Sequence, residues 1–175
     1  MTQEITTERL VLRPIAVADA PFIVHLDSFE AVRQYLLMPN PSVLHEVTEK
    51  LEKTVAERAA RPDFGFWIAR SESDPIGWFH LKAPTTKGTE LGYRLLPSAW
   101  GRGFATEGGR ALIERSFGYL RMDRVFATTL ADNLRSRRVM ERLGMSLAEE
   151  YLHLDIRPAV EYEIRNTSDE PTSNG

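Results

Sequence analysis

The stretch AWGRGFATEGG, Ala99 to Gly109, places four glycines within nine residues, and a sequence with helical periodicity, residues 110–120, follows at once. Glycine in a helix interior costs about 1 kcal/mol relative to alanine, so a helix that begins this way gains something from bare backbone. A glycine-rich turn from a strand into a helix exposes N–H groups at the positive end of the helix, which suits a phosphate. The alternative is that the glycines only permit a tight turn.

Two well-known phosphate-binding patterns fit this stretch poorly. The Walker pattern ends in Gly-Lys-Ser/Thr, whereas Phe104 and Ala105 follow Gly103 in this chain. The dinucleotide fingerprint requires glycine or alanine at the position of Thr106, and it belongs near the first strand of a fold. The stretch therefore predicts an anion site of another kind.

Outward from this stretch, the chain alternates between strand and helix patterns. Ser42 and Asn133 are expected to cap the helices that they begin, and Gly144 is expected to end the second of these helices. The order predicts an α/β (α+β) protein with one domain over residues 1–165 and a disordered tail over 166–175. The expected strands are residues 9–15, 64–70, 75–83, 89–96, 124–130, 145–154 and 161–165, and the expected helices are 17–26, a short one within 28–41, 42–62, 105–120 and 133–144.

Composition excludes several classes of protein. The 175 residues are 42% hydrophobic and 27% charged, and no apolar run approaches the roughly 18 residues of a membrane span. The N-terminus lacks the basic and apolar regions of a signal peptide, so we expect a cytoplasmic protein. The absence of cysteine excludes a disulfide and a cysteine nucleophile, and four scattered histidines predict no metal site. A net charge of −3 argues against a nucleic-acid partner.

Two separate segments carry a resemblance to a known family. Residues 89–117, TELGYRLLPSAWGRGFATEGGRALIERSF, and residues 127–145, ATTLADNLRSRRVMERLGM, resemble the acetyl-CoA-binding core of the GNAT superfamily of N-acetyltransferases. More narrowly, they are similar to the branch of the RimJ/RimL-type ribosomal-protein N-terminal acetyltransferases, as are TERLVLRP and FEAVRQYL nearer the N-terminus. The resemblance implies the GNAT fold, with a mixed, mostly antiparallel sheet of about six to seven strands, flanking helices and a splayed cofactor slot.

The resemblance also implies how the chain binds acetyl-CoA. The strand that ends at Leu95 and Leu96 is expected to hydrogen-bond the pantetheine arm as an added strand would, and the side-chain amide of Asn133 is expected to contact the same arm. Arg102, Arg137 and Arg138 are candidates for pairing with the cofactor phosphates; the alternative is that they are solvated charges. The amides expected to cradle the pyrophosphate belong to Gly101, Arg102, Gly103, Phe104, Ala105 and Thr106.

The transfer of an acetyl group to an amine requires a base for the amine and a donor for the departing thiolate. Ser136 matches the position at which this branch has a serine thought to protonate the thiolate. Glu90 is the first candidate for the base, since a desolvated site can raise the pKa of a carboxyl group. His80 is the second candidate, and water can also relay the proton. Glu107 is expected only to complement the helix dipole.

These residues predict an acetyl-CoA-dependent N-acetyltransferase that acts on a primary amine by direct transfer, with a homodimer as one possible assembly. The alternatives are a non-catalytic acyl-CoA sensor and a ribosome-associated binding protein. Acceptor recognition is expected from residues 29–41 and from a loop at 156–160, because loops on a rigid scaffold often carry specificity. Four aromatic residues are expected either to line the acceptor cleft or to lie in the core: Trp67, Trp78, Phe79 and Tyr93.

Overall fold

The computed structural model describes residues 4–36, 38, 40–154 and 156–167. Within this part of the chain, eight strands form one sheet in the order β1-β2-β3-β4-β5-β6-β8-β7. The strands are β1 (Ile5–Thr6), β2 (Val11–Pro14), β3 (Gly65–Ser71), β4 (Asp74–Leu81), β5 (Thr89–Leu95), β6 (Arg124–Leu130), β7 (Ser146–His153) and β8 (Arg157–Arg165). The helices are α1 (Ala20–Ser28), α2 (Glu30–Arg33), α3 (Leu44–Ala60), α4 (Phe104–Gly118) and α5 (Leu134–Arg142), with short 3-10 turns at Val17–Asp19 and Pro97–Ala99.

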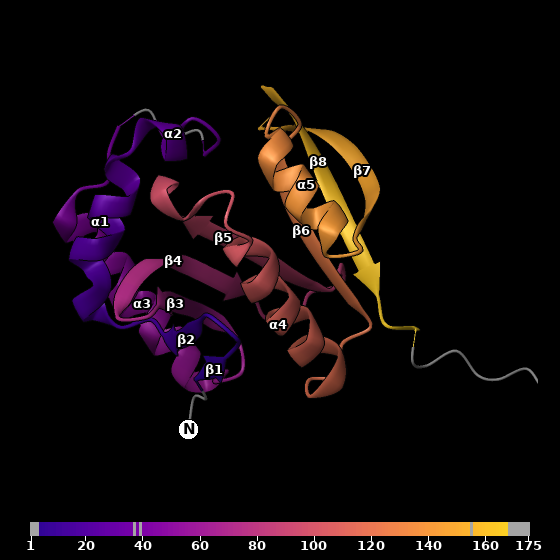
Figure 1. Cartoon of the computed structure of the whole chain (residues 1–175), viewed down its shortest axis with the longest axis horizontal. Coiled ribbons are helices and arrows are strands. Elements are labelled where there is room, and N and C mark those ends of the chain that lie inside the picture. Colours follow the sequence, from indigo (N-terminus) through magenta and orange to yellow (C-terminus); the bar gives the residue numbers. More distant parts are fainter. Residues whose placement is uncertain (1–3, 37, 39, 155, 168–175) are drawn as a thin grey trace, which may run out of the picture.

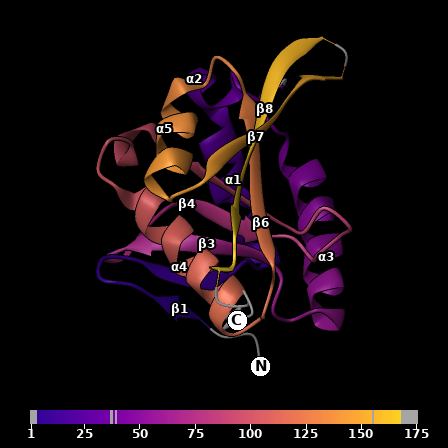
Figure 2. The same cartoon turned by 90° about the vertical axis from the view of Figure 1, so that its right-hand side faces the viewer.

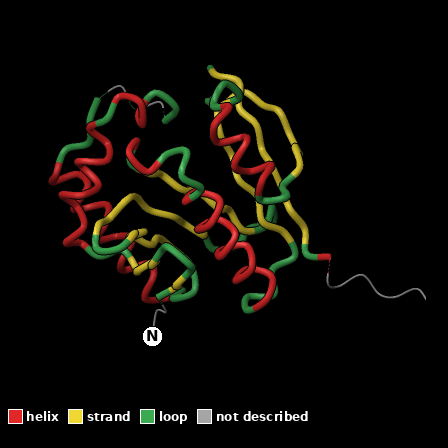
Figure 3. Tube along the Cα trace, in the orientation of Figure 1, coloured by secondary structure: helices red, strands yellow, loops and turns green. Residues whose placement is uncertain are grey.

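The sheet divides into two halves that splay apart between β5 and β6 (Figure 1, Figure 3). These two strands form the one parallel pair among the described strands, and they pair only where Thr89 faces Val125 and Glu90 faces Phe126. Every other neighbouring pair is antiparallel. The expected mixed, mostly antiparallel sheet with a splayed slot is therefore confirmed. The strand count is slightly higher than expected because the two-residue β1 is too short to show an alternating pattern.

Helices cover both faces of the sheet (Figure 2). On one face, Ile23 of α1 and Val47 and Leu51 of α3 pack with Ile68 of β3 in a small apolar cluster. On the other face, the larger core contains Leu112 of α4 together with residues of β2 to β6, α5 and β8. The apolar stripe of the expected helix 105–120 therefore faces the sheet, as its spacing predicted.

Several local predictions need correction. Ser42 does not cap a helix, because α3 begins after Val43, and the Ser42 hydroxyl instead hydrogen-bonds the buried carboxylate of Asp27. The expected loop at 156–160 is mostly strand, since β8 begins at Arg157, which pairs with His153.

Two of the four aromatic candidates lie in the core. Trp67 and Phe79 are 1% and 0% exposed, whereas Trp78 and Tyr93 are partly buried.

Only the first two residues of the predicted tail, 166 and 167, belong to the described part of the chain. The N–H of Asn166 donates to the carbonyl of Asp123, and residues 168–175 lie outside the described part of the chain. Over the described residues, no helix combines the length and the apolar character that crossing a membrane would require.

Candidate functional site

The N–H and carbonyl groups of β5 point alternately toward β4 and toward β6, from which β5 splays apart. The carbonyl of Glu90 accepts the N–H of Lys82 at 2.9 Å, and the N–H of Leu96 donates to Ile76 at 2.8 Å, so even-numbered residues pair with β4. Because hydrogen-bonding direction alternates along an antiparallel pair, the odd-numbered residues turn their main-chain groups toward β6. Beyond the two paired positions β6 has diverged, which leaves these groups facing an open slot.

The structure places the two leucines of the predicted pantetheine strand differently. Leu95 faces the slot by this alternation, and its carbonyl accepts the indole N–H of Trp100 at 2.9 Å. Leu96 donates its N–H to Ile76 and accepts the N–H of Ala99 at 2.9 Å. The main-chain groups that face the slot are therefore those of Leu91, Tyr93 and Leu95, whereas the N–H and the carbonyl of Leu96 are both already hydrogen-bonded.

The glycine turn presents a row of N–H groups. Gly101 and Gly103 have φ angles of 72° and 83°, in the left-handed region that favours glycine, and a Cβ on Gly101 would meet no atom within 4 Å. The first main-chain bond of α4 runs from Glu107 N–H to Gly103 at 3.0 Å. In the described part of the chain no main-chain carbonyl accepts the six preceding N–H groups, those of Gly101, Arg102, Gly103, Phe104, Ala105 and Thr106.

The N-terminal segment fastens this turn. The Glu107 carboxylate accepts hydrogen bonds from the Thr7 hydroxyl at 2.6 Å and the Arg9 main-chain N–H at 2.8 Å, and it forms an ion pair with the Arg9 guanidinium at 2.6 Å. Arg9 also donates to the carbonyl of Arg102 at 2.9 Å and stacks over Phe104. Burial raises the pKa of Glu107, but the hydrogen bonds from Thr7 and Arg9 lower it to a greater extent. Glu107 thus does more than complement a dipole.

The start of α5 lies across the slot from β5. Asn133 caps this helix, as predicted, by accepting the N–H of Ser136 at 3.2 Å, and its amide nitrogen donates to Thr129 at 3.1 Å. Arg137 is half-buried and donates to the Tyr162 hydroxyl and to the Ala131 carbonyl. Arg138 is exposed and has no polar partner among the described residues, which leaves it free to meet a phosphate.

Ser136 meets a residue that the sequence did not single out for chemistry. The Tyr93 hydroxyl on β5 lies 3.0 Å from the Ser136 Oγ on α5. Burial raises the pKa of Tyr93 to about 12, although the hydrogen bond with Ser136 lowers it in part. The one sequence signal was the alternation of TELGYRL, which places Tyr93 on the same face as the buried Leu91 and Leu95.

The two base candidates lie together on the opposite face of the sheet. Glu90 Oε2 accepts a hydrogen bond from Lys82 at 2.8 Å, and Glu90 Oε1 lies 3.5 Å from His80 Nε2. Burial raises the pKa of Glu90, but the contacts with His80 and Lys82 outweigh it and bring the pKa to about 2. The expectation that this site raises the pKa of Glu90 is therefore wrong.

His80 is buried between aromatic rings. Its imidazole stacks on Trp78 at 5.7 Å and meets the edge of Phe66, and it covers Gly92, where a Cβ would come within 2.4 Å of the ring. Burial lowers the pKa of His80, more than the neighbouring Glu90 raises it. The imidazole is therefore neutral at pH 7 and keeps a free lone pair.

A buried ion pair joins β5 to α1, next to the segment expected to recognise the acceptor. Arg94 of β5 bonds the carboxylate of Asp27 in α1 at 2.6 Å and stacks over Trp78. Arg33 of α2 donates to the Asp27 carbonyl at 2.9 Å, and Ser42 bonds the same Asp27 carboxylate. Asp27 is thus bonded by Arg33 within the predicted acceptor segment, 29–41, and by Ser42 directly after it; residues 37 and 39 lie outside the described part.

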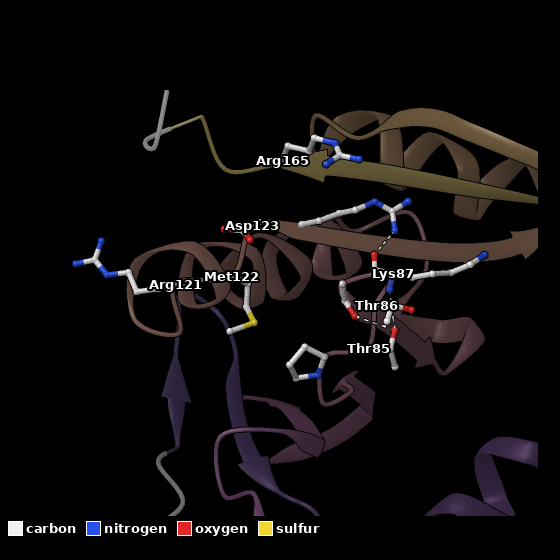
Figure 4. Close-up of a pocket in the computed structure, with 10 residues that line it drawn as sticks. Thr85, Thr86, Lys87, Arg121, Met122, Asp123 and Arg165 are labelled. Atoms are coloured by element: carbon white, nitrogen blue, oxygen red, sulfur yellow. Dashed lines mark hydrogen bonds between the residues drawn. The ribbon is translucent and has the colours of Figure 1, made fainter. Parts of the chain in front are cut away.

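A separate surface hollow of about 500 Å³ lies at the closed end of the slot (Figure 4). Its cations are largely neutralised, because Arg124 and Arg165 pair with Glu163 and Lys87 lies 3.7 Å from Glu161. Arg121 points away from the loop of Thr85, Thr86 and Lys87 in Figure 4. The hollow therefore offers little unpaired positive charge to an anion. The described residues contain no cluster of three potential metal ligands.

Comparisons with known proteins identify a family and several related sequences. A family model described as an acetyltransferase (GNAT) domain matches residues 9–146. An FsC-acetyl coenzyme A-N(2)-transacetylase of Aspergillus fumigatus is 29% identical over 156 residues, 84% of this chain and 66% of that protein. The uncharacterized N-acetyltransferase YoaA of Bacillus subtilis is 28% identical over 141 residues, 79% of this chain and 80% of that protein.

A solved structure has the same fold. RimL, a ribosomal L7/L12 alpha-N-protein acetyltransferase in complex with coenzyme A, aligns with a TM-score of 0.82 at 20% identity, over 95% of this chain and 100% of that one. The chain spans less than two thirds of the A. fumigatus relative, and the likeness to RimL concerns the fold. The family model nevertheless covers most of the chain, including the glycine turn and α5. The chain therefore belongs to the acetyltransferase (GNAT) family, whose enzymes use acetyl-CoA as the acetyl donor.

Proposed function

We propose that this protein transfers an acetyl group from acetyl-CoA to a primary amine by direct attack of the amine within a ternary complex. The observation that carries the proposal is the row of six unbonded N–H groups from Gly101 to Thr106, set at the start of α4 and next to the splay of β5 and β6. A helix N-terminus with free N–H groups favours a phosphate, and the bare glycines allow close approach. The residues present therefore fit a pyrophosphate followed by a peptide-like arm.

The chain supplies matching contacts for that arm. Main-chain groups of Leu91, Tyr93 and Leu95 face the slot, where an added strand can reach them, although the Leu95 carbonyl already accepts the indole N–H of Trp100. Arg102, Arg138 and the cradle amides would hold the phosphates, and Asn133 retains one amide hydrogen for the arm. Bound acetyl-CoA supplies an acetyl group activated as a thioester. The chain has no cysteine that could carry the acetyl group as an acetyl-enzyme, which favours direct attack of the amine on the thioester.

We propose that the amine arrives from the face that carries Glu90, His80 and Arg94. The Glu90 carboxylate is a quarter exposed and stays anionic at neutral pH, so it attracts and orients an ammonium or amine. His80 lies behind it with a neutral imidazole, because burial lowers its pKa, and it or a water molecule is the second candidate to accept the amine proton. Ser136, on the opposite side of the slot, donates a hydrogen bond to the departing sulfur.

The finer assignment is also a proposal. The motifs WGRGFATE and N-x-x-S-x-x-V-x-x-x-L-G-M support the RimJ/RimL-like branch, for which a protein N-terminus is the acceptor. The A. fumigatus relative, named for an N(2)-transacetylase, supports a small-molecule amine equally well. We therefore propose an acceptor from one of these two classes. A cytoplasmic site of action and a homodimer are separate proposals, which follow the expectations from the sequence.

An amine panel tests the proposal. Purified protein is incubated with acetyl-CoA and peptides with free N-termini, amino acids, polyamines or aminoglycosides, and free CoA thiol and acetylated product are measured. We expect CoA release that depends on one class of amine. We also expect CoA and acetyl-CoA, but not NAD or ATP, to raise the melting temperature. Stabilisation without turnover would identify an acyl-CoA sensor, and absence of both would contradict the proposal.

A further inference from the structure

One hydrogen bond links the two sides of the cofactor slot. Tyr93 extends from β5, on the first half of the sheet, and Ser136 belongs to α5, which is packed on the second half (Figure 1). Their hydroxyl oxygens are 3.0 Å apart, whereas the Tyr93 oxygen is 3.5 Å from the Ser136 carbonyl. The hydroxyl-to-hydroxyl contact is therefore the stronger of the two.

The chemistry of the two hydroxyl groups favours one direction of this bond. A phenol is more acidic than an aliphatic alcohol, so it is the better donor, and the serine oxygen is the better acceptor. The Ser136 main-chain N–H is already bonded to Asn133, so the first turn of α5 holds the serine in place. If Tyr93 donates to Ser136 Oγ, the serine hydrogen is free to point into the slot.

We propose that Tyr93 is a positioning residue, which donates its hydrogen to Ser136 Oγ and thereby aims the Ser136 hydroxyl hydrogen at the sulfur that leaves during acetyl transfer. The inference rests on the proposed function. In the transfer, the amine nitrogen forms a bond to the acetyl carbon, the carbon–sulfur bond breaks, and its electron pair passes to sulfur. Ser136 stabilises that charge by a hydrogen bond, while the proton released by the amine leaves through the opposite face of the sheet.

The surroundings of Tyr93 suit this role. Its ring packs against Phe79 in the core, with centroids 5.9 Å apart, so the phenol has little freedom to turn away from α5. Burial keeps the phenol protonated throughout the neutral range, because the raised pKa lies at about 12. A group that never loses its proton in this range is a steady donor to Ser136 and a poor acid in its own right.

The test compares Tyr93→Phe, which removes one oxygen atom, with Ser136→Ala and the double variant, in steady-state assays with acetyl-CoA and the amine found by the panel. We expect Tyr93→Phe to lower kcat about tenfold with a KM for acetyl-CoA within about twofold of wild type. Ser136→Ala should lower kcat at least as much. Adding Tyr93→Phe to Ser136→Ala should have no further effect, because the hydroxyl that Tyr93 positions is then absent.

Tyr162→Phe is the matched control. Tyr162 is also a buried tyrosine, and its hydroxyl also bonds α5, through Arg137 and Glu141 at 3.2 Å each, but away from Ser136. It should keep wild-type kcat while losing similar stability to urea. Unchanged kcat in Tyr93→Phe, multiplicative losses in the double variant, or an equal loss of kcat in Tyr162→Phe would each overturn the inference. A wild-type protein without turnover would instead contradict the proposed function, and the inference with it.

Discussion

Glu90 illustrates how neighbouring side chains set the chemistry of one residue. The pattern TELGY shows that Glu90 and Tyr93 lie on opposite faces of a strand, but it contains neither Lys82 nor His80. Those residues approach Glu90 because the β4–β5 hairpin adopts a register that places His80 opposite Gly92. The connecting loop is too irregular for its sequence to fix that register. The sequence could therefore identify Glu90 as a candidate base, but it could not predict the direction of its pKa shift.

The lowered pKa of Glu90 predicts a specific loss of stability in acid. The carboxylate is stabilised in the folded protein, so its contribution is complete above the ordinary pKa near 4.5 and is lost as the pH falls toward about 2. Glu90→Gln should therefore be less stable than wild type at pH 7, and the difference should shrink as the pH falls through this range. Urea unfolding at a series of pH values measures it. Glu114→Gln, at an exposed position on α4, is the control, and a constant Glu90→Gln difference would contradict the argument.

Gly92 permits the packing of His80. Because a Cβ at this position would lie 2.4 Å from His80 Cε1, Gly92→Ala forces the imidazole off Trp78. We expect a loss of about 1–3 kcal/mol in the free energy of unfolding, as for other overpacked sites. Gly118→Ala, at the end of α4 where a Cβ would meet nothing within 4 Å, should be neutral. Equal effects of the two substitutions in urea unfolding would contradict this account.

At the scale of elements, α4 was the most predictable part of the molecule. Its apolar stripe and its glycine turn are local signals, and the cap of α5 by Asn133 is local as well. The contacts of Glu107 with Thr7 and Arg9, which we call the clamp on the glycine turn, are not local, because these partners lie about a hundred residues earlier in the chain. The first of these partners follows β1, a strand too short for a periodic signal. Long-range side-chain bonds of this kind depend on the assembled sheet.

Loss of the clamp should affect cofactor binding. Glu107→Ala leaves Arg9 without its ion pair, and Arg9 also holds the carbonyl of Arg102 within the cradle. We expect roughly a threefold to tenfold rise in KM for acetyl-CoA with little change in kcat, and about 1 kcal/mol less stability. Glu114→Ala, two turns further along α4, is the matched control. An unchanged KM for acetyl-CoA would show that the cradle keeps its shape without the clamp.

At the scale of the whole molecule, the two halves of the sheet are fastened differently at the two ends of the slot. At the closed end, Arg124 of β6 donates to the carbonyl of Lys87, just before β5, and is held by Glu161 and Glu163 of β8 in its own half. At the open end, β5 and β6 share no ladder, and the halves are joined by side chains such as the Tyr93 and Ser136 pair. The fold class followed from the order of helices and strands together with the family resemblance. These side-chain bonds could not be predicted in the same way, because they join residues that only the completed fold brings together.

Arg157 provides a link at the open end. This residue, at the start of β8, donates to the carbonyl of Gln34 after α2 at 3.0 Å and to Asp132 before α5 at 2.7 Å. It therefore ties the segment expected to recognise the acceptor to the second half of the sheet. Its side chain is about one third exposed, so the link costs little to break.

Arg157→Ala should therefore change acceptor binding more than cofactor binding. We expect KM for the amine to rise about threefold to tenfold, while KM for acetyl-CoA and the melting temperature stay near wild type. Arg165→Ala, at the far end of the same strand, removes an exposed pair with Glu163 and is the matched control. Equal changes in both KM values would mean that Arg157 holds the two halves together as a whole. A change confined to the amine would locate acceptor recognition between α2 and the β7–β8 hairpin.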